Sequence, residues 1–200
     1  MPCKKELITT FAAMKLRIAL LAIAIVSCTN ARAAWVGNEK LDDALRLTPW
    51  IAAATMKACG MESRHDWPAL VATAAASGAL SAGITYTLKA TIDEPRPDGS
   101  DNRSFPSGHA TIAFAGATVL HKEFGRVSPW ISVAGYSVAT FTAVDRVLAD
   151  RHHWYDVAAG AAIGVLSTEL CYYVSGKIFK DKGVSVAFNG SGFDVAINIR

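Results

Sequence analysis

Three short polar clusters separate the apolar runs of this 200-residue chain, and they contain the side chains that could carry out a reaction. The members of the clusters are Lys89, Arg96-Pro97, Pro106-Ser107-Gly108-His109, Arg146, His152 and Asp156. The three cations would repel one another beside an apolar bundle unless an anion lay between them, and the planar Arg fork suits phosphate oxygens. Ser107 and Gly108 precede an apolar run, and the unpaired N–H groups at the start of a helix there would also bind an anion. The clusters therefore predict a site for an anionic group such as phosphate.

The two histidines and the carboxylate could supply the catalytic groups of that site. His152 and Asp156 lie one helical turn apart, so the carboxylate can hold the imidazole in one tautomer and leave its other nitrogen free to attack. His109 is a second imidazole, able to protonate a leaving oxygen. Two other interpretations stay open: His152, His153 and Asp156 could bind a metal ion, and the cations could be ordinary charges at helix ends.

The order and spacing of the clusters resemble a known signature. Lys89-x6-Arg96-Pro97, then Pro106-Ser107-Gly108-His109, then Arg146-x5-His152-x3-Asp156 is similar to the three-part signature of the type 2 phosphatidic acid phosphatase superfamily. That superfamily includes membrane lipid phosphatases, secreted bacterial class A acid phosphatases and vanadium haloperoxidases. Asp145 departs from the pattern, because the family usually has Ser there. We expect Asp145 to turn away from the phosphate or to pair with Arg146, since an inward carboxylate would repel a bound phosphate.

The resemblance implies a role for each cluster. His152 would attack phosphorus and form a phosphohistidine, Asp156 would orient His152, and His109 would protonate the leaving group and then activate water. The remaining motif residues would hold the phosphate oxygens: Lys89, Arg96, Arg146, Ser107 and the N–H of Gly108. No metal ion or other cofactor is implied, because the cations stabilise the developing charge.

The leaving group of such a phosphatase has no readable code in the sequence. The favoured substrate is a lipid phosphate or pyrophosphate, with phosphatidate, a polyprenyl pyrophosphate and lipid A as examples. A soluble, secreted acid phosphatase of broad specificity is the first alternative. A catalytically silent phosphate-binding membrane protein is the second, for which Asp145 is the one hint.

The elements that would position these residues are predicted to be helices. Apolar runs of helical length occupy 45–59, 67–88, 110–120, 129–144 and 156–174, and none of them alternates with period two. If neighbouring helices are antiparallel, the three polar clusters fall at one end of the bundle. We therefore predict an all-α bundle of five or six helices as the phosphatase domain, over residues 34–182. By hydropathy, the second run is the one long enough to span a membrane.

The C-terminal tail, residues 183–200, follows another pattern. Apolar residues alternate over 184–188 and again over 193–199, on either side of Asn189-Gly190-Ser191-Gly192. Such alternation around a Gly-rich turn predicts a β-hairpin. An isolated hairpin is marginally stable in water, so this one should pack on the bundle, on lipid or on a partner.

The N-terminal segment, residues 1–33, has the composition of a leader. A basic start precedes an apolar run over 18–26, and Ala31-Arg32-Ala33 supplies small residues of the kind that signal peptidase recognises. The segment is predicted to be a signal peptide or a retained membrane anchor, with a lipid on Cys28 as a third alternative. Each alternative places the domain in the bacterial cell envelope. It would face the periplasm from the inner membrane, or it would be periplasmic or secreted after cleavage.

The composition limits the kinds of partner. Hydrophobic residues make up 52% of the chain and charged residues 18%, which is typical of a membrane protein or a helical bundle with little polar surface. Residues 1–33 hold five basic residues and one acidic residue, so without them the net charge falls from +3 to −1. A nucleic-acid-binding domain carries a basic face, so nucleic acid is excluded as a partner. The expected partners are a membrane and a phosphate ester.

Overall fold

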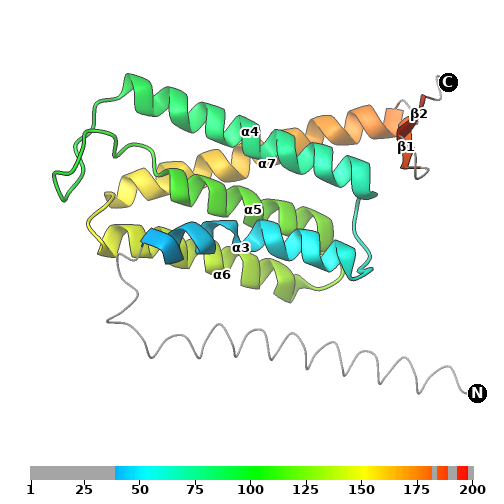
Figure 1. Ribbon diagram of the computed structural model, residues 1–200, viewed down its shortest axis with the longest axis horizontal. Helices are drawn as coiled ribbons and strands as arrows, with labels where there is room; N and C mark the ends of the chain where they lie inside the picture. Colours follow the sequence, from blue (N-terminus) through cyan, green and yellow to red (C-terminus); the bar gives the residue numbers. More distant parts are fainter. Residues whose placement is uncertain (1–38, 182–183, 189–192, 198–200) are drawn as a thin grey trace, which may run out of the picture. The chain divides into compact units, whose positions relative to one another are not determined.

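The structure is a computed structural model that describes residues 39–181, 184–188 and 193–197. Its five helices are α3 (Glu39–Ala58), α4 (Trp67–Thr91), α5 (Gly108–Phe124), α6 (Pro129–Leu148) and α7 (Trp154–Asp181). Successive helices run in opposite directions (Figure 1). The described residues therefore confirm the predicted helical bundle, whereas the leader predicted over 1–33 lies outside them.

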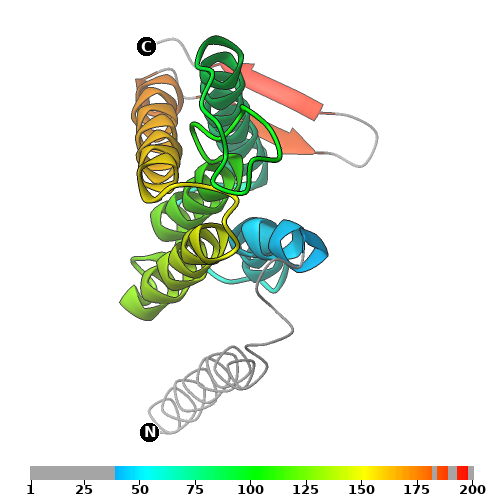
Figure 2. The same cartoon turned by 90° about the vertical axis from the view of Figure 1, so that its left-hand side faces the viewer.

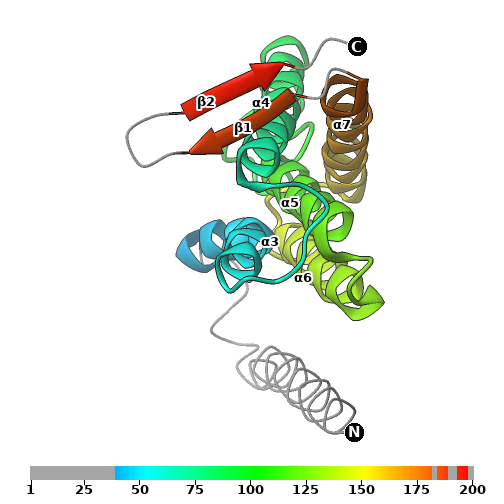
Figure 3. The ribbon, with the colours of Figure 1, turned by 90° about the vertical axis from the view of Figure 1, so that its right-hand side faces the viewer.

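The predicted hairpin in the tail is present. Strands β1 (Val184–Phe188) and β2 (Phe193–Ile197) pair antiparallel, with Val186 opposite Val195. Strand β1 contacts α4 and α7 (Figure 3). The hairpin thus adds two strands to an otherwise helical domain.

Helix α5 lies at the centre of the bundle and packs against each of the other four helices. Figure 3 shows α4 and α7 on one side of it and α3 and α6 on the other. Most of its buried residues are Ala, Gly or Thr, whose small side chains let neighbouring helices approach closely. Trp50 of α3 fills the space beside Gly116, and its Nε1 donates a hydrogen bond of 2.9 Å to the carbonyl oxygen of Ile112.

Helices α5 and α7 touch through their backbones. A Cβ added to Gly160 would lie 2.5 Å from the carbonyl oxygen of Ser107. One added to Gly164, a turn later on α7, would overlap the carbonyl oxygen of Thr111. These two glycines fix the start of α5 against α7, and therefore fix the second polar cluster relative to the third.

The three polar clusters lie at one end of the bundle, as predicted, where the α4–α5 and α6–α7 connections run side by side (Figure 2). The two connections are joined by hydrogen bonds. The backbone N–H of Asp98 donates to the carbonyl oxygen of Asp150, at 3.0 Å, and Arg151 Nη1 donates to Asp98 Oδ2, at 3.1 Å. Tyr155 Oη donates to Glu94 Oε1, at 2.6 Å. The acidic α4–α5 connection is thus bonded to the rest of the domain.

Helix α3 begins six residues before the run predicted over 45–59. Its first turns are polar and contain Asp42, Asp43 and Arg46, so a search for apolar periodicity misses them. The N-terminus of α3 lies at the same end of the bundle as the three clusters (Figure 1). The helix therefore brings additional charged residues to that end.

Replacing Gly160 by Ala should destabilise the protein by about 1–3 kcal/mol, because the added methyl group overlaps the α5 backbone and α7 must shift. The free energy of unfolding by denaturant measures this loss. Gly176→Ala is the matched control in the same helix, since nothing lies within 4 Å of a Cβ added there. The control should stabilise the helix slightly, by about 0.4–1 kcal/mol. Equal effects of the two substitutions would contradict the close packing of α5 on α7.

Candidate active site

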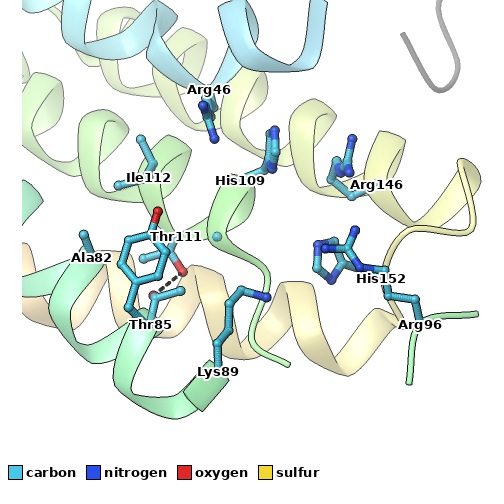
Figure 4. Close-up of a pocket in the computed structure, with 12 residues that line it drawn as sticks. Arg46, Ala82, Thr85, Lys89, Arg96, His109, Thr111, Ile112, Arg146 and His152 are labelled. Carbon is cyan, nitrogen blue, oxygen red and sulfur yellow. Dashed lines mark hydrogen bonds between the residues drawn. The ribbon is translucent and has the colours of Figure 1, made fainter. Parts of the chain in front are cut away.

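A cavity of about 210 Å³ lies at this end of the bundle (Figure 4). Six of the predicted site residues line it: Lys89, Arg96, Gly108, His109, Arg146 and His152. The other lining residues are Arg46, Ala82, Thr85, Tyr86, Thr111 and Ile112. The two remaining predicted residues, Ser107 and Asp156, are fully buried behind the lining. The structure thus brings residues from all three clusters together.

Ser107 forms the N-terminal cap of α5. Its hydroxyl oxygen accepts a hydrogen bond from the N–H of Ala110, at 3.5 Å, and its own N–H donates to the carbonyl oxygen of Asp156, at 3.0 Å. This cap holds the first turn of the helix beside the cavity, and Gly108 forms part of the wall. The positive end of the helix dipole is therefore available to an anion.

A serine that the motifs do not include lies between His152 and Asp156. His152 Nδ1 is 3.7 Å from Asp156 Oδ2, which is too long for a hydrogen bond. The Ser104 hydroxyl donates to Asp156 Oδ2, at 2.5 Å, and its oxygen is 3.4 Å from His152 Nδ1. Ser104 is therefore placed to link the imidazole to the carboxylate. No spacing rule marks this residue in the sequence.

His153 is the third residue of the alternative metal site formed by His152, His153 and Asp156. Its Nδ1 lies 3.4 Å from Asp156 Oδ2, and its ring stacks on Tyr155 with centroids 4.9 Å apart. No three His, Cys, Asp or Glu side chains are grouped as metal ligands within the described part of the chain.

The cations of the cavity are each held by an oxygen. Lys89 Nζ donates to the carbonyl oxygen of Arg103, at 2.5 Å, and Arg96 Nε donates to Asp101 Oδ1, at 2.7 Å. Arg146 Nη1 donates to Asp42 Oδ2 of α3, at 2.5 Å. None of the described residues that line the cavity is acidic. The lining of the cavity is therefore positively charged.

The pair of Asp42 and Arg146 is buried, since their side chains are 1% and 4% exposed. No motif in the sequence marks Asp42, which is 104 residues from its partner. Arg146 Nε is buried and has no hydrogen-bond partner among the described residues. Asp145 is buried and does not line the cavity, in line with the expectation that it turns away.

The surroundings of His152 favour its neutral form. Burial, and then the positive charges of Lys89, Arg96 and Arg146, lower the pKa of His152 to about 3, while Asp156 acts in the opposite direction. Loss of solvation and nearby cations both disfavour an imidazolium ion. At neutral pH the imidazole therefore carries the lone pair that a nucleophile needs.

His109, like His152, lies beside positively charged side chains. Its Nε2 is 3.1 Å from Asp43 Oδ1, another acidic residue of α3. Burial, and then Arg146 and Arg46, lower the pKa of His109 to about 4, and the hydrogen bond to Asp43 raises it in part. A bound phosphate would add negative charge beside the ring and move this pKa upward.

One side of the cavity is apolar and lies next to an uncovered helix. Ala82 and Tyr86 of α4 and Ile112 of α5 line that side, and Tyr86 is 72% exposed. Helices α4 and α7 are long and apolar enough to cross a membrane, with 33% and 28% of their most apolar windows buried. The sequence predicted such a span in α4 alone. Most residues of those two windows are not buried by the described part of the chain.

Known proteins are similar to this chain over different parts of its length. The family model described as the PAP2 superfamily matches residues 69–180. A Porphyromonas gingivalis protein named lipid A 1-phosphatase is 42% identical over 145 residues, which cover 72% of this chain and 33% of that protein. An Arabidopsis thaliana protein named lipid phosphate phosphatase 1 is 38% identical over 82 residues, which cover 36% of this chain and 25% of that protein. The chain thus spans a third or less of the length of these relatives.

Two solved structures are also similar. The crystal structure of Aquifex aeolicus LpxE aligns with a TM-score of 0.47 and 22% identity, over 68% of this chain and 87% of that one. A Bacillus subtilis transmembrane PAP2 type phosphatidylglycerolphosphate phosphatase aligns with a TM-score of 0.43 and 20% identity, over 84% of this chain and 96% of that one. The family match alone covers more than half of the chain and includes all three polar clusters. The chain therefore belongs to the PAP2 superfamily, which its three motifs resemble.

Proposed function

We propose that the chain is a phosphatase that hydrolyses lipid phosphates or pyrophosphates through a phosphohistidine on His152, without a metal ion. The observation that carries this proposal is the neutral, buried His152 in the wall of a cavity whose other lining residues include four cations. A neutral imidazole can attack phosphorus, and surrounding cations stabilise the charge of the transition state.

In the first step, His152 Nε2 attacks phosphorus while the bond from phosphorus to the leaving oxygen breaks. The Ser104 hydroxyl, itself bonded to Asp156, lies beside Nδ1, so Nε2 is the nitrogen free to react. Protonated His109 gives its proton to the leaving oxygen, so that an alcohol or a phosphate departs rather than an unstable anion. Lys89, Arg146 and the N-terminus of α5 hold the phosphoryl oxygens.

In the second step, water attacks the phosphoryl group and the bond from phosphorus to His152 Nε2 breaks. His109, neutral after the first step, takes a proton from the water and returns to its starting state. The products are inorganic phosphate and free His152. The same two histidines therefore serve both steps with opposite proton transfers.

Three observations support a lipid as the carrier of the phosphate. The relative that is 42% identical is named a lipid A 1-phosphatase, and the Arabidopsis relatives are named lipid phosphate phosphatases. One side of the cavity is apolar and borders α4. The apolar helices α4 and α7 are mostly uncovered by the rest of the domain, which favours a membrane protein over a soluble acid phosphatase. We place the site on the periplasmic side of a bacterial envelope membrane, as the leader predicts.

A substrate panel tests this function. Purified protein should release phosphate from at least one of phosphatidate, undecaprenyl pyrophosphate and lipid A, with activity unchanged by EDTA and inhibited by vanadate. Vanadate adopts the five-coordinate geometry of the transition state and should therefore bind tightly. Loss of activity in EDTA that zinc or magnesium restores would show that His152, His153 and Asp156 bind a metal. A preference for a water-soluble aryl phosphate would support the soluble acid phosphatase instead.

The roles of the two histidines can be separated by trapping the intermediate. His152→Ala should abolish labelling of the protein by ³²P substrate, because the nucleophile is gone. His109→Ala should still become labelled by an aryl phosphate, whose leaving group needs little protonation, and should lose the label slowly. Label found on His109 or His153 after acid quenching and peptide mapping would contradict the assignment.

The link through Ser104 has its own test. Ser104→Ala should lower kcat by about 10- to 100-fold with little change in KM, because His152 loses its orienting partner while the cations remain. Ser132→Ala is a matched control, since Ser132 Oγ makes a 2.8 Å hydrogen bond with His121 Nδ1 outside the cavity. The control should keep full activity. An unchanged kcat in Ser104→Ala would show that Asp156 orients His152 without the serine.

A further inference from the structure

Helix α3 brings a carboxylate to His109 that neither the motifs nor the reaction steps account for. Asp43 Oδ1 is 3.1 Å from His109 Nε2 and 3.0 Å from Arg46 Nη2, one turn further along α3. The His109 side chain is 20% exposed, so its ring is mostly shielded from water. Asp43 is therefore hydrogen-bonded to one of the two ring nitrogens of His109, the proposed general acid.

The Asp43 carboxylate counteracts the positive charges that disfavour protonation of His109. A general acid must be protonated before it can act, yet burial and the positive charges of Arg146 and Arg46 disfavour the protonated form of His109. The charged and titratable groups of the neighbouring elements are Arg46 and Asp42 on α3, Tyr86 and Lys89 on α4, Arg96 in the α4–α5 connection, Arg146 on α6 and His152 in the α6–α7 connection. Asp42 is bonded to Arg146, so its charge is largely compensated.

The balance of these groups disfavours the imidazolium form of His109. Burial, Arg146 and Arg46 lower its pKa to about 4, and the hydrogen bond and charge of Asp43 act in the opposite direction. The phosphate of the substrate supplies further negative charge for the first step. After the leaving group has departed, the carboxylate remains in place for the second step.

We propose that Asp43 is a positioning residue for His109, in an inference that rests on the proposed phosphatase function. Its carboxylate accepts a hydrogen bond from Nε2–H, which fixes the ring and leaves Nδ1 to exchange the proton with the substrate. In the first step the Nδ1 proton passes to the leaving oxygen. In the second step a proton from water returns to Nδ1. Nε2–H stays bonded to Asp43 throughout, and Arg46 holds the carboxylate in place.

Helix α3 then has two functions at adjacent positions. Asp42 orients Arg146, which is proposed to bind the phosphate. Asp43 orients His109, which is proposed to donate and accept the proton. The same two turns of one helix thus orient a phosphate-binding residue and an acid–base residue. A change at Asp43 should affect proton transfer while leaving phosphate binding intact.

The test compares two leaving groups in the full chain. Asp43→Ala and Asp43→Asn are assayed with phosphatidate, whose leaving group is a poor one, and with p-nitrophenyl phosphate, whose leaving group needs little protonation. We expect Asp43→Ala to lower kcat for phosphatidate by about 10- to 100-fold and kcat for the aryl phosphate by less than about 3-fold. Asp43→Asn keeps an oxygen near Nε2 but removes the charge, so its loss should be smaller.

The pH profile provides a second readout. Asp43 raises the pKa of His109, so removing its charge lowers that pKa. The protonated form is needed for the first step, and activity falls as the pH rises through the pKa. In both variants the alkaline limb of kcat for phosphatidate should therefore move to lower pH.

A double variant separates positioning from a general structural role. If Asp43 acts through His109, adding Asp43→Ala to His109→Ala should cause little further loss with phosphatidate. Glu169→Gln is the control, because it removes an exposed carboxylate from an ion pair with Lys122, at 2.6 Å, outside the cavity. The control should match the unmodified protein in both assays.

Two results would overturn the inference while leaving the proposed function in place. They are an equal loss for the two substrates with additive effects in the double variant, or full activity of Asp43→Ala with an unshifted pH profile. An unmodified protein that hydrolyses none of the phosphate esters in either assay would overturn the proposed function, and this inference with it.

Discussion

Electrostatic repulsion among the cations of the cavity is the constraint on which the site depends. Like charges within a few ångströms raise the energy of the empty site by about 1–4 kcal/mol per pair at effective dielectric constants between those of water and a protein surface. The structure compensates from behind, through Asp42 on Arg146, Asp101 on Arg96 and backbone carbonyls on Lys89. These oxygens hold the cations without filling the cavity, so the remaining compensation is left to an anion that arrives from outside.

The bundle makes such an arrangement rigid. Helix α5 contacts each of the other four helices of the described residues, and Gly160 and Gly164 bring the α7 backbone onto its first two turns. The proposed nucleophile, the helix terminus proposed to bind phosphate and the proposed general acid are therefore held by neighbouring, tightly packed elements. Charge stabilisation of a transition state is most effective when the charged groups need no rearrangement during the reaction.

The sequence predicted the helices, the hairpin and the convergence of the three clusters, because apolar periodicity and motif spacing are local properties. It did not predict the contributions of α3. Asp42 and Asp43 lie in a polar turn ahead of the apolar run, and their partners are 104 and 66 residues away. Ser104 was missed for a related reason, since the spacing of His152 and Asp156 suggests a direct bond and gives no sign of a bridging hydroxyl. Contacts between distant polar residues leave no periodic pattern in a single chain.

Ala82, Tyr86 and Ile112 form the apolar side of the cavity. For the proposed lipid substrate, this side determines which measure of substrate concentration sets the reaction rate. For the proposed lipid phosphatase, a phosphate on a lipid would reach that side by lateral diffusion in the bilayer, in two dimensions, without leaving the membrane. The rate would then depend on the mole fraction of the substrate among the surrounding lipids and not on its amount per volume of solution. Dilution of the membrane with inert lipid or detergent would slow turnover even when every substrate molecule remained in the sample.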